Sequence, residues 1–420
     1  MIESLMILGR QPALGIAELE SLYGADKVRP VGNQAAWLSV DPCLVAFNRL
    51  GGTVKFCKIL TTLDTTNWGA IEKFLLKVAP TQATTMPDGK MTLGLSAYDM
   101  SVTPARLNAT GLSLKKAIRK SSSRSVRLVP NNDTELSSAQ VYHNHLTHER
   151  AWELIFVRDS NQTIIAQTVR VQDIDAYTER DRERPKRDSK VGMLPPKLAQ
   201  TIINLAAGQL PAEQLSSICD IPANAPIQTP HLDATILDPF CGTGVVLQEA
   251  LLMGYHAYGS DLEQRMIDYS QVNLDWLTTK SQIPNDRFRL EQSDATRYHW
   301  DFSSIQPPQS SIFVAAETYL GRPFTTTPTP DVLTQTITEC NLIIKKFLQN
   351  LTSQLPSGAR LCVAVPAWRS GNHFRHLPLV DSLEEIGYNQ VRFEHVPDDG
   401  LLYHREDQFV ARHLLVLTKR

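Results

Sequence analysis

The sequence predicts an α/β protein whose C-terminal part, residues 196–420, folds as a doubly wound and mostly parallel sheet. Apolar strand candidates recur there at 234–238, 256–260, 287–291, 311–316 and 360–365. Helical patterns lie between most of them, and such alternation favours parallel strands because each crossover helix returns the chain to the same edge. A glycine turn after the first of these strands and an acid at the end of the second mark the expected ligand edge.

The preceding residues, 1–172, predict an α+β region. Strand candidates lie at 5–8, 36–40, 91–95 and 152–157, and an amphipathic helix is expected over 15–22. Residues 173–195 contain a dense run of charges, which indicates a linker or surface segment between the two parts. Near the C-terminus, residues 390–396 and 411–418 predict two further strands.

Composition limits the class of protein. The chain has 420 residues, 42% of them hydrophobic and 20% charged, which is typical of soluble globular proteins. Six scattered cysteines suggest reduced thiols, and the N-terminus lacks a basic signal region, so we expect a cytoplasmic protein. No apolar run reaches the roughly 20 residues that span a bilayer. The net charge of −2 gives no overall nucleic-acid signature.

The turn Asp238-Pro239-Phe240-Cys241-Gly242-Thr243-Gly244 is the most informative stretch of the chain. Its glycines allow backbone N–H groups to converge on a ligand, and the following helix adds the partial positive charge of its N-terminus. Asp261 ends the next strand, about 20 residues further on, where an acid suits a ribose diol. A dinucleotide site would need G-x-G-x-x-G, which is not present in this turn. A nucleoside-bearing cofactor is therefore expected across two strand ends.

The D-P-F-C-G-T-G turn resembles the first motif of S-adenosylmethionine (SAM)-dependent methyltransferases. Together with Gly192-Met193-Leu194-Pro195-Pro196-Lys197-Leu198-Ala199 and Ile7-Leu8-Gly9-Arg10, it resembles the tRNA guanosine N2-methyltransferases that carry an N-terminal THUMP domain. The resemblance is strongest over 171–261. It implies a THUMP-type RNA-binding region in 1–172 and a class I Rossmann-like methyltransferase domain in 196–420 that ends in an antiparallel hairpin.

The resemblance also implies the cofactor, SAM, and the residues around it. The methionine end would meet Asp238, Pro239, Phe240, Cys241, Gly242 and Gly244. The ribose would meet Asp261 and Leu262, and the adenine would meet Asp294 and Ala295. The implied partner is tRNA, with a small activating protein as a further option and the oligomeric state left open.

The fourth strand departs from the family pattern. The family has [D/N]-P-P-[Y/F] where this chain has Ala316-Glu317-Thr318-Tyr319. An exocyclic amine is a poor nucleophile, so an oxygen must accept its N–H groups while an aromatic ring stacks on the base. We expect Glu317 and Tyr319 to fill these catalytic roles in a shifted geometry. Two alternatives stay open: methylation of DNA or another exocyclic amine, and a catalytically decayed protein that binds SAM or RNA.

A basic segment favours nucleic acid. No acidic residue occurs between Met100 and Asn132. The candidate RNA-binding residues there are Arg106, Lys115, Lys116, Arg119, Lys120 and Arg124. A phosphate partner would relieve the repulsion between these like charges. The alternative interpretation is a helix face that is simply exposed to solvent, as most charge clusters are. The histidines of 143–148 lack a familiar metal-ligand spacing, so no metal is predicted.

Overall fold

The computed structural model describes residues 3–122, 124–188, 193–209, 232–302, 311–324, 326–371, 373–406 and 408–420. The chain divides into two compact units. The first comprises Met1–Pro12, Asp26–Asn48 and Thr53–Ala176, and the second comprises Ala13–Ala25, Arg49–Gly52 and Tyr177–Arg420. Within the segment predicted as a linker, Ile174–Arg182 forms helix α5, whereas 189–192 lie outside the described residues.

The described part of the first unit contains an eight-stranded mixed sheet of order β2-β3-β1-β4-β8-β7-β5-β6. Its strands are β1 (Ser4–Leu8), β2 (Val28–Val31), β3 (Ala35–Leu38), β4 (Thr53–Leu63), β5 (Met91–Tyr98), β6 (Val126–Leu128), β7 (Ala151–Asp159) and β8 (Gln162–Val171). β5 pairs in parallel with both β6 and β7, whereas the other neighbours pair antiparallel. The four predicted strand segments are present, but the sequence did not predict these parallel pairs.

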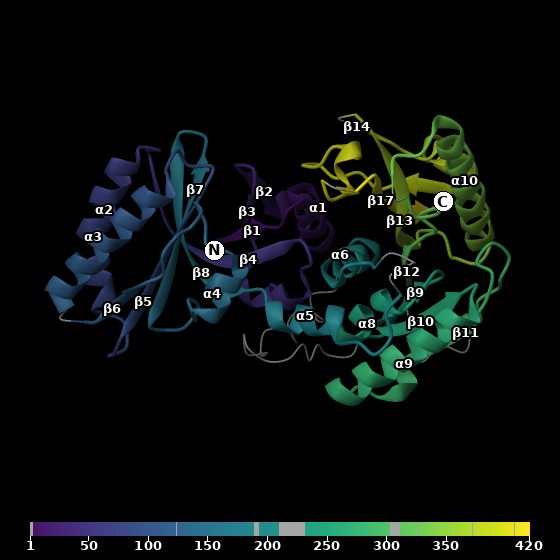
Figure 1. Ribbon diagram of the computed structural model, residues 1–420, viewed down its shortest axis with the longest axis horizontal. Coiled ribbons are helices and arrows are strands. Elements are labelled where there is room, and N and C mark those ends of the chain that lie inside the picture. The colour runs from purple at the N-terminus through teal and green to yellow at the C-terminus, as the bar shows by residue number, and fades with distance from the viewer. Residues whose placement is uncertain are drawn as a thin grey trace. The chain divides into compact units, whose positions relative to one another are not determined.

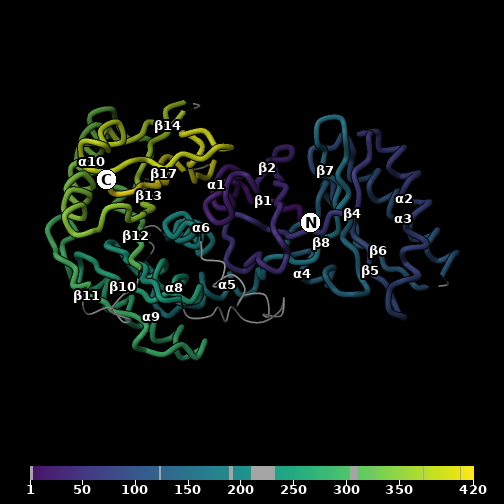
Figure 2. The backbone as a smooth tube through the Cα atoms, turned by 180° about the vertical axis from the view of Figure 1, so that it is seen from behind, coloured from purple at the N-terminus to yellow at the C-terminus, as the bar shows by residue number. Residues whose placement is uncertain are grey.

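Helices α2 (Trp68–Ala83) and α3 (Pro104–Ser122) lie side by side on one face of this sheet, as Figures 1 and 2 show. Their apolar residues pack on Met91 and Leu93 of β5, both fully buried. A shorter helix, α4 (Ser138–His143), begins with a capping box between Ser137 and Gln140. It belongs to a separate cluster of buried residues that includes Leu136 and Leu146.

A buried ion pair lies inside the first unit. Lys55 on β4 and Glu153 on β7 have side chains at most 1% exposed, and Nζ lies 2.5 Å from Oε1. Glu153 also accepts the hydroxyls of Ser96 and Thr168, each at 2.6 Å, and Lys55 donates to the Leu136 carbonyl at 2.8 Å. Burial works to lower the pKa of Lys55, but the Glu153 carboxylate raises it above its usual range. Both charges are therefore satisfied within the protein.

The second unit contains a nine-stranded sheet in its described part, with the main order β11-β10-β9-β12-β13-β17-β15. Its strands are β9 (Ala234–Asp238), β10 (His256–Asp261), β11 (Phe288–Gln292), β12 (Ser311–Glu317), β13 (Arg360–Ser370), β14 (His373–Arg375), β15 (Tyr388–Gln390), β16 (Leu402–Tyr403) and β17 (Val410–Lys419). The five strands from β11 to β13 are parallel, and β17 and β15 follow antiparallel. The chain reverses its direction of travel across the sheet between β9 and β12, which is where open α/β sheets bind ligands.

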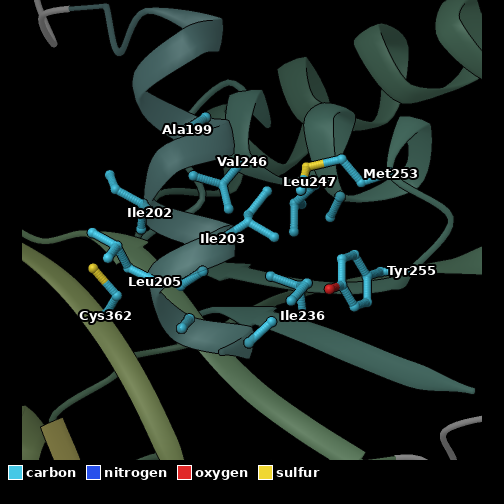
Figure 3. Packing of buried hydrophobic residues seen from close by; sticks show 14 of the residues in the cluster. Ala199, Ile202, Ile203, Leu205, Ile236, Val246, Leu247, Met253, Tyr255 and Cys362 are labelled. Carbon is cyan, nitrogen blue, oxygen red and sulfur yellow. The ribbon is translucent and has the colours of Figure 1, made fainter. Parts of the chain in front are cut away.

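Helices cover both faces of this sheet. One face carries α1 (Pro12–Tyr23), α6 (Pro196–Ala207), α8 (Val245–Leu252) and α9 (Gln264–Ser281), and the other carries α10 (Pro330–Thr352) and α11 (Leu383–Ile386). Figure 3 shows α6 lying over the strands, with Ile202, Ile203 and Leu205 close to Ile236 of β9 and Cys362 of β13. Gly192, the first residue of the 192–199 motif, lies outside the described residues.

One predicted strand is wrong. Residues 390–396 were expected to be extended, but β15 ends at Gln390. The Val391 amide still bonds to the Val416 carbonyl at 2.8 Å, and the chain then leaves the sheet. The next amides, of Glu394 and His395, donate instead to the Glu20 carboxylate of α1 at 2.8 and 2.9 Å. A side-chain acceptor on a distant helix thus replaces a strand neighbour.

Within the described residues, no helix is both long and apolar enough to cross a membrane.

Candidate functional site at the carboxyl ends of the parallel strands

The glycine turn joins β9 to α8 and has the conformation that its sequence requires. Gly242 and Gly244 have φ values of +51° and +84°, in the left-handed region that glycine enters without strain. A Cβ at Gly244 would come within 3.0 Å of Ser270 Oγ, whereas one at Gly242 would meet nothing nearer than 4.0 Å. The turn is therefore packed tightly on one side and open at Gly242.

Two side chains of α9 hold the turn in place. Ser270 Oγ donates to the Gly242 carbonyl at 2.7 Å, and Asn273 Nδ2 donates to the Thr243 carbonyl at 2.9 Å. Asn273 also exchanges hydrogen bonds with the backbone of Lys186, at 2.8 and 2.9 Å. The sequence alone did not point to these residues. The visible signal is a serine and an asparagine three positions apart, on the face of an amphipathic helix that the structure buries.

Asp261 links the turn to the end of β10. Its carboxylate accepts the Gly242 amide and the Glu263 amide, each at 3.0 Å. Burial raises the pKa of Asp261, and these two amide donors oppose the shift. A carboxylate has about four acceptor sites, so two bonds leave capacity for a diol. The adjacent Leu262 is 66% exposed, which places an apolar side chain beside this acid at the surface.

Asp238, the last residue of β9, is a buried acid among other acids. It is 2% exposed and accepts the Phe240 amide at 3.1 Å. Burial raises the pKa of Asp238 well above its usual value, and the charges of Asp261 and Glu317 raise it further. Among the described residues no cation pairs with it. A cationic group bound beside Asp238 would relieve the repulsion between these acids.

The other residues of the turn point to the opposite face or are enclosed. Phe240 packs edge-on against Phe347 of α10, with ring centroids 5.0 Å apart. Cys241 is buried, and burial raises the pKa of its thiol well above the usual value, which disfavours the reactive thiolate. Pro239 lies between Asp238 and Phe240 at the start of the turn and is buried.

Asp294 follows β11, the edge strand of the sheet, which is separated from β9 by β10. Its carboxylate accepts the hydroxyl and the amide of Thr296 at 2.7 and 3.0 Å and pairs with Arg297 at 3.1 Å. The Thr296 hydroxyl is the main cause of its lowered pKa. Ala295 is buried, and its carbonyl accepts Asn350 Nδ2 at 3.0 Å. The segment is connected to the site because the amide of Ser293 donates to the Asp261 carbonyl.

Glu317, at the end of β12, forms an ion pair with Arg412 of β17. The two residues flank β13, where Glu317 is in register with Ala364 and Arg412 with Pro366. The small Ala364 side chain leaves room for the pair to pass over β13. Burial raises the pKa of Glu317, and Arg412 opposes that shift. Arg412 was also missed, although a single arginine within the apolar strand 411–418 is a visible signal.

Glu317 and Tyr319 lie toward different faces of the sheet. Alternation along β12 places Glu317 with Phe313 and Ala315, on the face that carries α8. Tyr319 is 40% exposed, and burial, with Cys340 and Glu339 of α10 nearby, raises the pKa of its hydroxyl. The segment thus brings Glu317 to the other acids but carries the Tyr319 ring over α10.

Most of the expected RNA-binding residues lie on α3. The Arg106 guanidinium pairs with the Glu72 carboxylate of α2. The remaining basic side chains of the helix are exposed or partly exposed: Lys115, Lys116, Arg119 and Lys120. The helix buries Leu114 and Ile118 against the sheet, so the basic side chains form its solvent side.

Arg124 has a different place. It is 9% exposed, and its guanidinium donates to the carbonyls of Met86 and Pro87 at 2.9 and 2.8 Å. It therefore fixes the loop before β5 and does not belong to the exposed basic side of α3. Spacing along a charged segment does not separate a buried arginine from an exposed one.

Comparison with known proteins gives a consistent family resemblance. No family model matches the chain. The tRNA (guanine(10)-N2)-dimethyltransferase of Pyrococcus abyssi is 25% identical over 198 residues, which cover 47% of this chain and 49% of that protein. The protein of the same name from Methanothermobacter thermautotrophicus is 29% identical over 134 residues, or 31% and 32% of the two chains. The matches thus span about half, or less, of the length of these curated relatives.

TrmN from Thermus thermophilus is a solved structure similar to this chain, with a TM-score of 0.51 at 14% identity and coverage of 100% of both chains. At this identity the likeness concerns the fold. The second unit has five parallel strands followed by two antiparallel ones, which is the arrangement expected of a class I methyltransferase. This chain therefore has a class I methyltransferase fold.

Proposed function

We propose that this protein is a SAM-dependent methyltransferase that acts on tRNA, with the exocyclic N2 amine of a guanosine as the acceptor. The observation that carries the proposal is the group of carboxyls from Asp238, Asp261 and Glu317 beside an open glycine turn, at the point where the sheet reverses its strand order. The names of the two curated relatives support the tRNA and the amine.

The chemistry of the site supports SAM as the cofactor. A buried acid with a raised pKa and acidic neighbours suits a cation, an acid at the end of the second strand suits a ribose, and Gly242 leaves space for a ligand. Asp238, Phe240 and the backbone of the turn would hold the methionine end, and Asp261 the ribose hydroxyls. When bound, SAM supplies a methyl group activated by its sulfonium charge.

The remaining residues act on the cofactor and the acceptor from the same edge. Leu262 offers an exposed apolar surface next to Asp261, and Asp294 and Ala295 would border the adenine. Glu317 would accept hydrogen bonds from the acceptor amine, with Arg412 holding its carboxylate in place. Tyr319 is exposed enough to stack on a base. Orientation of this kind accounts for much of the rate enhancement in group transfer.

The two parts of the chain would divide the work. Residues 1–172 would form an RNA-binding region of the THUMP type, with the exposed lysines and arginines of α3 as phosphate contacts. Residues 196–420 would form the methyltransferase domain, which ends in the antiparallel pair of β15 and β17.

Incubation with tritiated SAM and bulk tRNA, followed by nucleoside analysis, tests this proposal. We expect label in N2-methylguanosine or N2,N2-dimethylguanosine and in no other nucleoside. Label in another nucleoside of the tRNA would assign a different methylated group, and label in DNA offered in a parallel reaction would replace tRNA as the acceptor. Saturable SAM binding without transfer to tRNA or DNA would leave a binding protein and reject the activity.

A further inference from the structure

A pocket of about 350 Å³ lies within the first unit, on a surface that the proposed function does not use. Its described lining residues are Lys90, Thr92, Arg127, Asn144, His145, His148, Arg150 and Ala151. This volume falls in the usual range for small-molecule sites, roughly 300–1,000 Å³. The pocket therefore has room for more than a single inorganic ion.

The parallel strands of the first unit form the floor of the pocket. Thr92 on β5 is in register with Arg127 on β6 and with Ala151 on β7. Register partners on neighbouring strands point to the same face, so these three side chains form one row. The small Thr92 and Ala151 side chains leave a hollow beside the long Arg127 side chain.

This row faces away from helices α2 and α3. Met91 and Leu93, the neighbours of Thr92 on β5, point to the opposite face and are buried in the cluster that includes both helices. The pocket and the basic side of α3 thus lie on opposite faces of one sheet. β5, β6 and α4 are found in the same lower part of the unit in Figures 1 and 2.

A fixed turn after α4 forms the rim. His145 has a φ of +52°, a left-handed conformation in which histidine is enriched among residues other than glycine. The His148 amide donates to the His145 carbonyl at 3.1 Å, and the Arg150 amide donates to His148 Nδ1 at 3.2 Å. The Arg127 guanidinium donates to the side-chain oxygen of Asn144, which orients it at the rim.

The charges of the pocket are uncompensated. Lys90, Arg127 and Arg150 bring three cations to one hollow, and none of the described lining residues is acidic. Within the described part of the chain, none of these three forms an ion pair with a carboxylate. Arginine forks match the oxygens of a phosphate, and clustered cations repel one another until an anion joins them.

We infer that this pocket binds a phosphate group of a nucleic-acid chain. The binding of a phosphate group is inferred from the pocket residues themselves, whereas the identity of the nucleic acid as tRNA rests on the proposed function. The pocket is a second contact, on the sheet face opposite to the basic side of α3, so RNA bound here would reach the edge of the sheet at β6.

The test uses the full-length protein and two matched double variants. Arg127→Gln with Arg150→Gln removes two charges from the pocket. Arg29→Gln with Arg158→Gln removes two charges from the same unit, outside the pocket lining. Unfolding curves establish that each variant folds, and Lys90→Gln is the substitute if the pocket double variant does not.

The first arm titrates inorganic phosphate while NMR follows the histidine ring signals. We expect saturable shifts of His145 and His148 in the parent and the control, and loss of these shifts in the pocket variant. Linear or absent shifts in the parent protein would overturn the inference, because the pocket would then have no affinity for phosphate.

The second arm measures tRNA affinity across a salt titration, with SAM affinity as a separate readout. The pocket variant should bind tRNA about tenfold more weakly, with a salt slope smaller by about 2, since each lost phosphate contact removes about one unit. SAM affinity should not change. Equal loss in both variants would reject the pocket as a specific contact. Specific phosphate shifts with no tRNA binding by the parent would instead reject tRNA as the partner and leave a site for free phosphate.

Discussion

Two buried acids, Glu153 in the first unit and Asp238 in the second, have opposite surroundings. In the first unit, Glu153 accepts hydrogen bonds from Lys55, Ser96 and Thr168, so its charge is fully compensated by its neighbours. In the second unit, Asp238 accepts a single backbone amide and is surrounded by other acids, which together with burial raise its pKa. Both carboxyl groups are almost completely buried.

The difference separates a structural acid from one that is prepared for a ligand. A satisfied network stabilises one arrangement of the core, whereas an unsatisfied acid costs stability until something binds. The proposed function assigns that role to the cationic cofactor. Removal of Lys55, the cation that compensates Glu153, and neutralisation of Asp238 should therefore change stability in opposite directions.

The largest effect is expected from breaking the satisfied pair. Lys55→Met leaves Glu153 buried without its cation, which should lower the free energy of unfolding by about 3–5 kcal/mol. Denaturant unfolding followed by a probe of the first unit measures this loss. The double variant Lys55→Met with Glu153→Leu should recover much of it, because no buried charge is left. A loss of less than about 1 kcal/mol in the single variant would contradict the structural role.

Next in size is the effect on catalysis. Glu317→Gln removes the charge that would draw the acceptor amine into line, and Tyr319→Ala removes the stacking ring. Each should lower methyl transfer to tRNA by about 100-fold, or ~2.7 kcal/mol, with little change in SAM affinity. Single-turnover rates with tritiated SAM measure the effect.

Glu385→Gln, at an exposed position of α11, is the matched control for the loss of one carboxylate. It should retain the parent rate. A Glu317→Gln protein as active as this control would remove Glu317 from the mechanism, and the same comparison decides for Tyr319.

Asp238→Asn should raise the free energy of unfolding, whereas Lys55→Met should lower it. In the folded protein the pKa of Asp238 is raised above its unfolded value of 3.8, so the folded state binds the proton more tightly. The free energy of unfolding of the parent therefore falls as the pH rises through the window between the two values. The asparagine variant lacks this titration, so it should be more stable by about 2 kcal/mol at neutral pH and gain nothing at a pH below 3.8.

The same substitution should weaken SAM binding by about tenfold, or 1.4 kcal/mol, because an attractive charge is lost. Unfolding curves at several pH values and calorimetric titration with SAM give the two numbers. Lower stability together with unchanged SAM affinity would make Asp238 an ordinary structural acid, like Glu153.

The smallest effect is expected on the surface of α3. Charge reversal at Lys116 and Arg119 should weaken tRNA binding by about three- to tenfold at low salt, without changing SAM affinity. Reversal of Lys73 and Lys77, which are exposed one turn apart on α2, is the control. Equal tRNA binding by the α3 variant and the parent across a salt titration would remove α3 from the interface.

Sequence patterns were sufficient for the parts of the fold that local physics determines. The five parallel strands of the second unit, the glycine turn and the acid of β10 all follow from alternation and turn chemistry, and the structure contains them at the expected places. The prediction of a strand over 390–396 was wrong because the amides of Glu394 and His395 bind Glu20, a residue more than 370 positions away. No local window contains that partner.

The candidate site shows the same limit. The sequence alone places three site residues together. Asp238 and Gly242 belong to the turn motif, and Asp261 follows at the spacing expected for the end of the next strand. Arg412 reaches Glu317 across β13, and Ser270 holds the turn from α9; these contacts depend on strand order and helix packing. Arg124 is the opposite case. Its charge in a basic segment predicted an RNA contact, but its guanidinium is buried against the loop before β5.

The most direct measurement of the central claim is a crystal structure of the protein at saturating S-adenosylhomocysteine, the demethylated product of SAM. We expect the ligand at the end of β9, with its amino-acid part on the 238–244 turn and its ribose hydroxyls on Asp261. Absence of the ligand from this edge, or its binding elsewhere in the protein, would contradict the account.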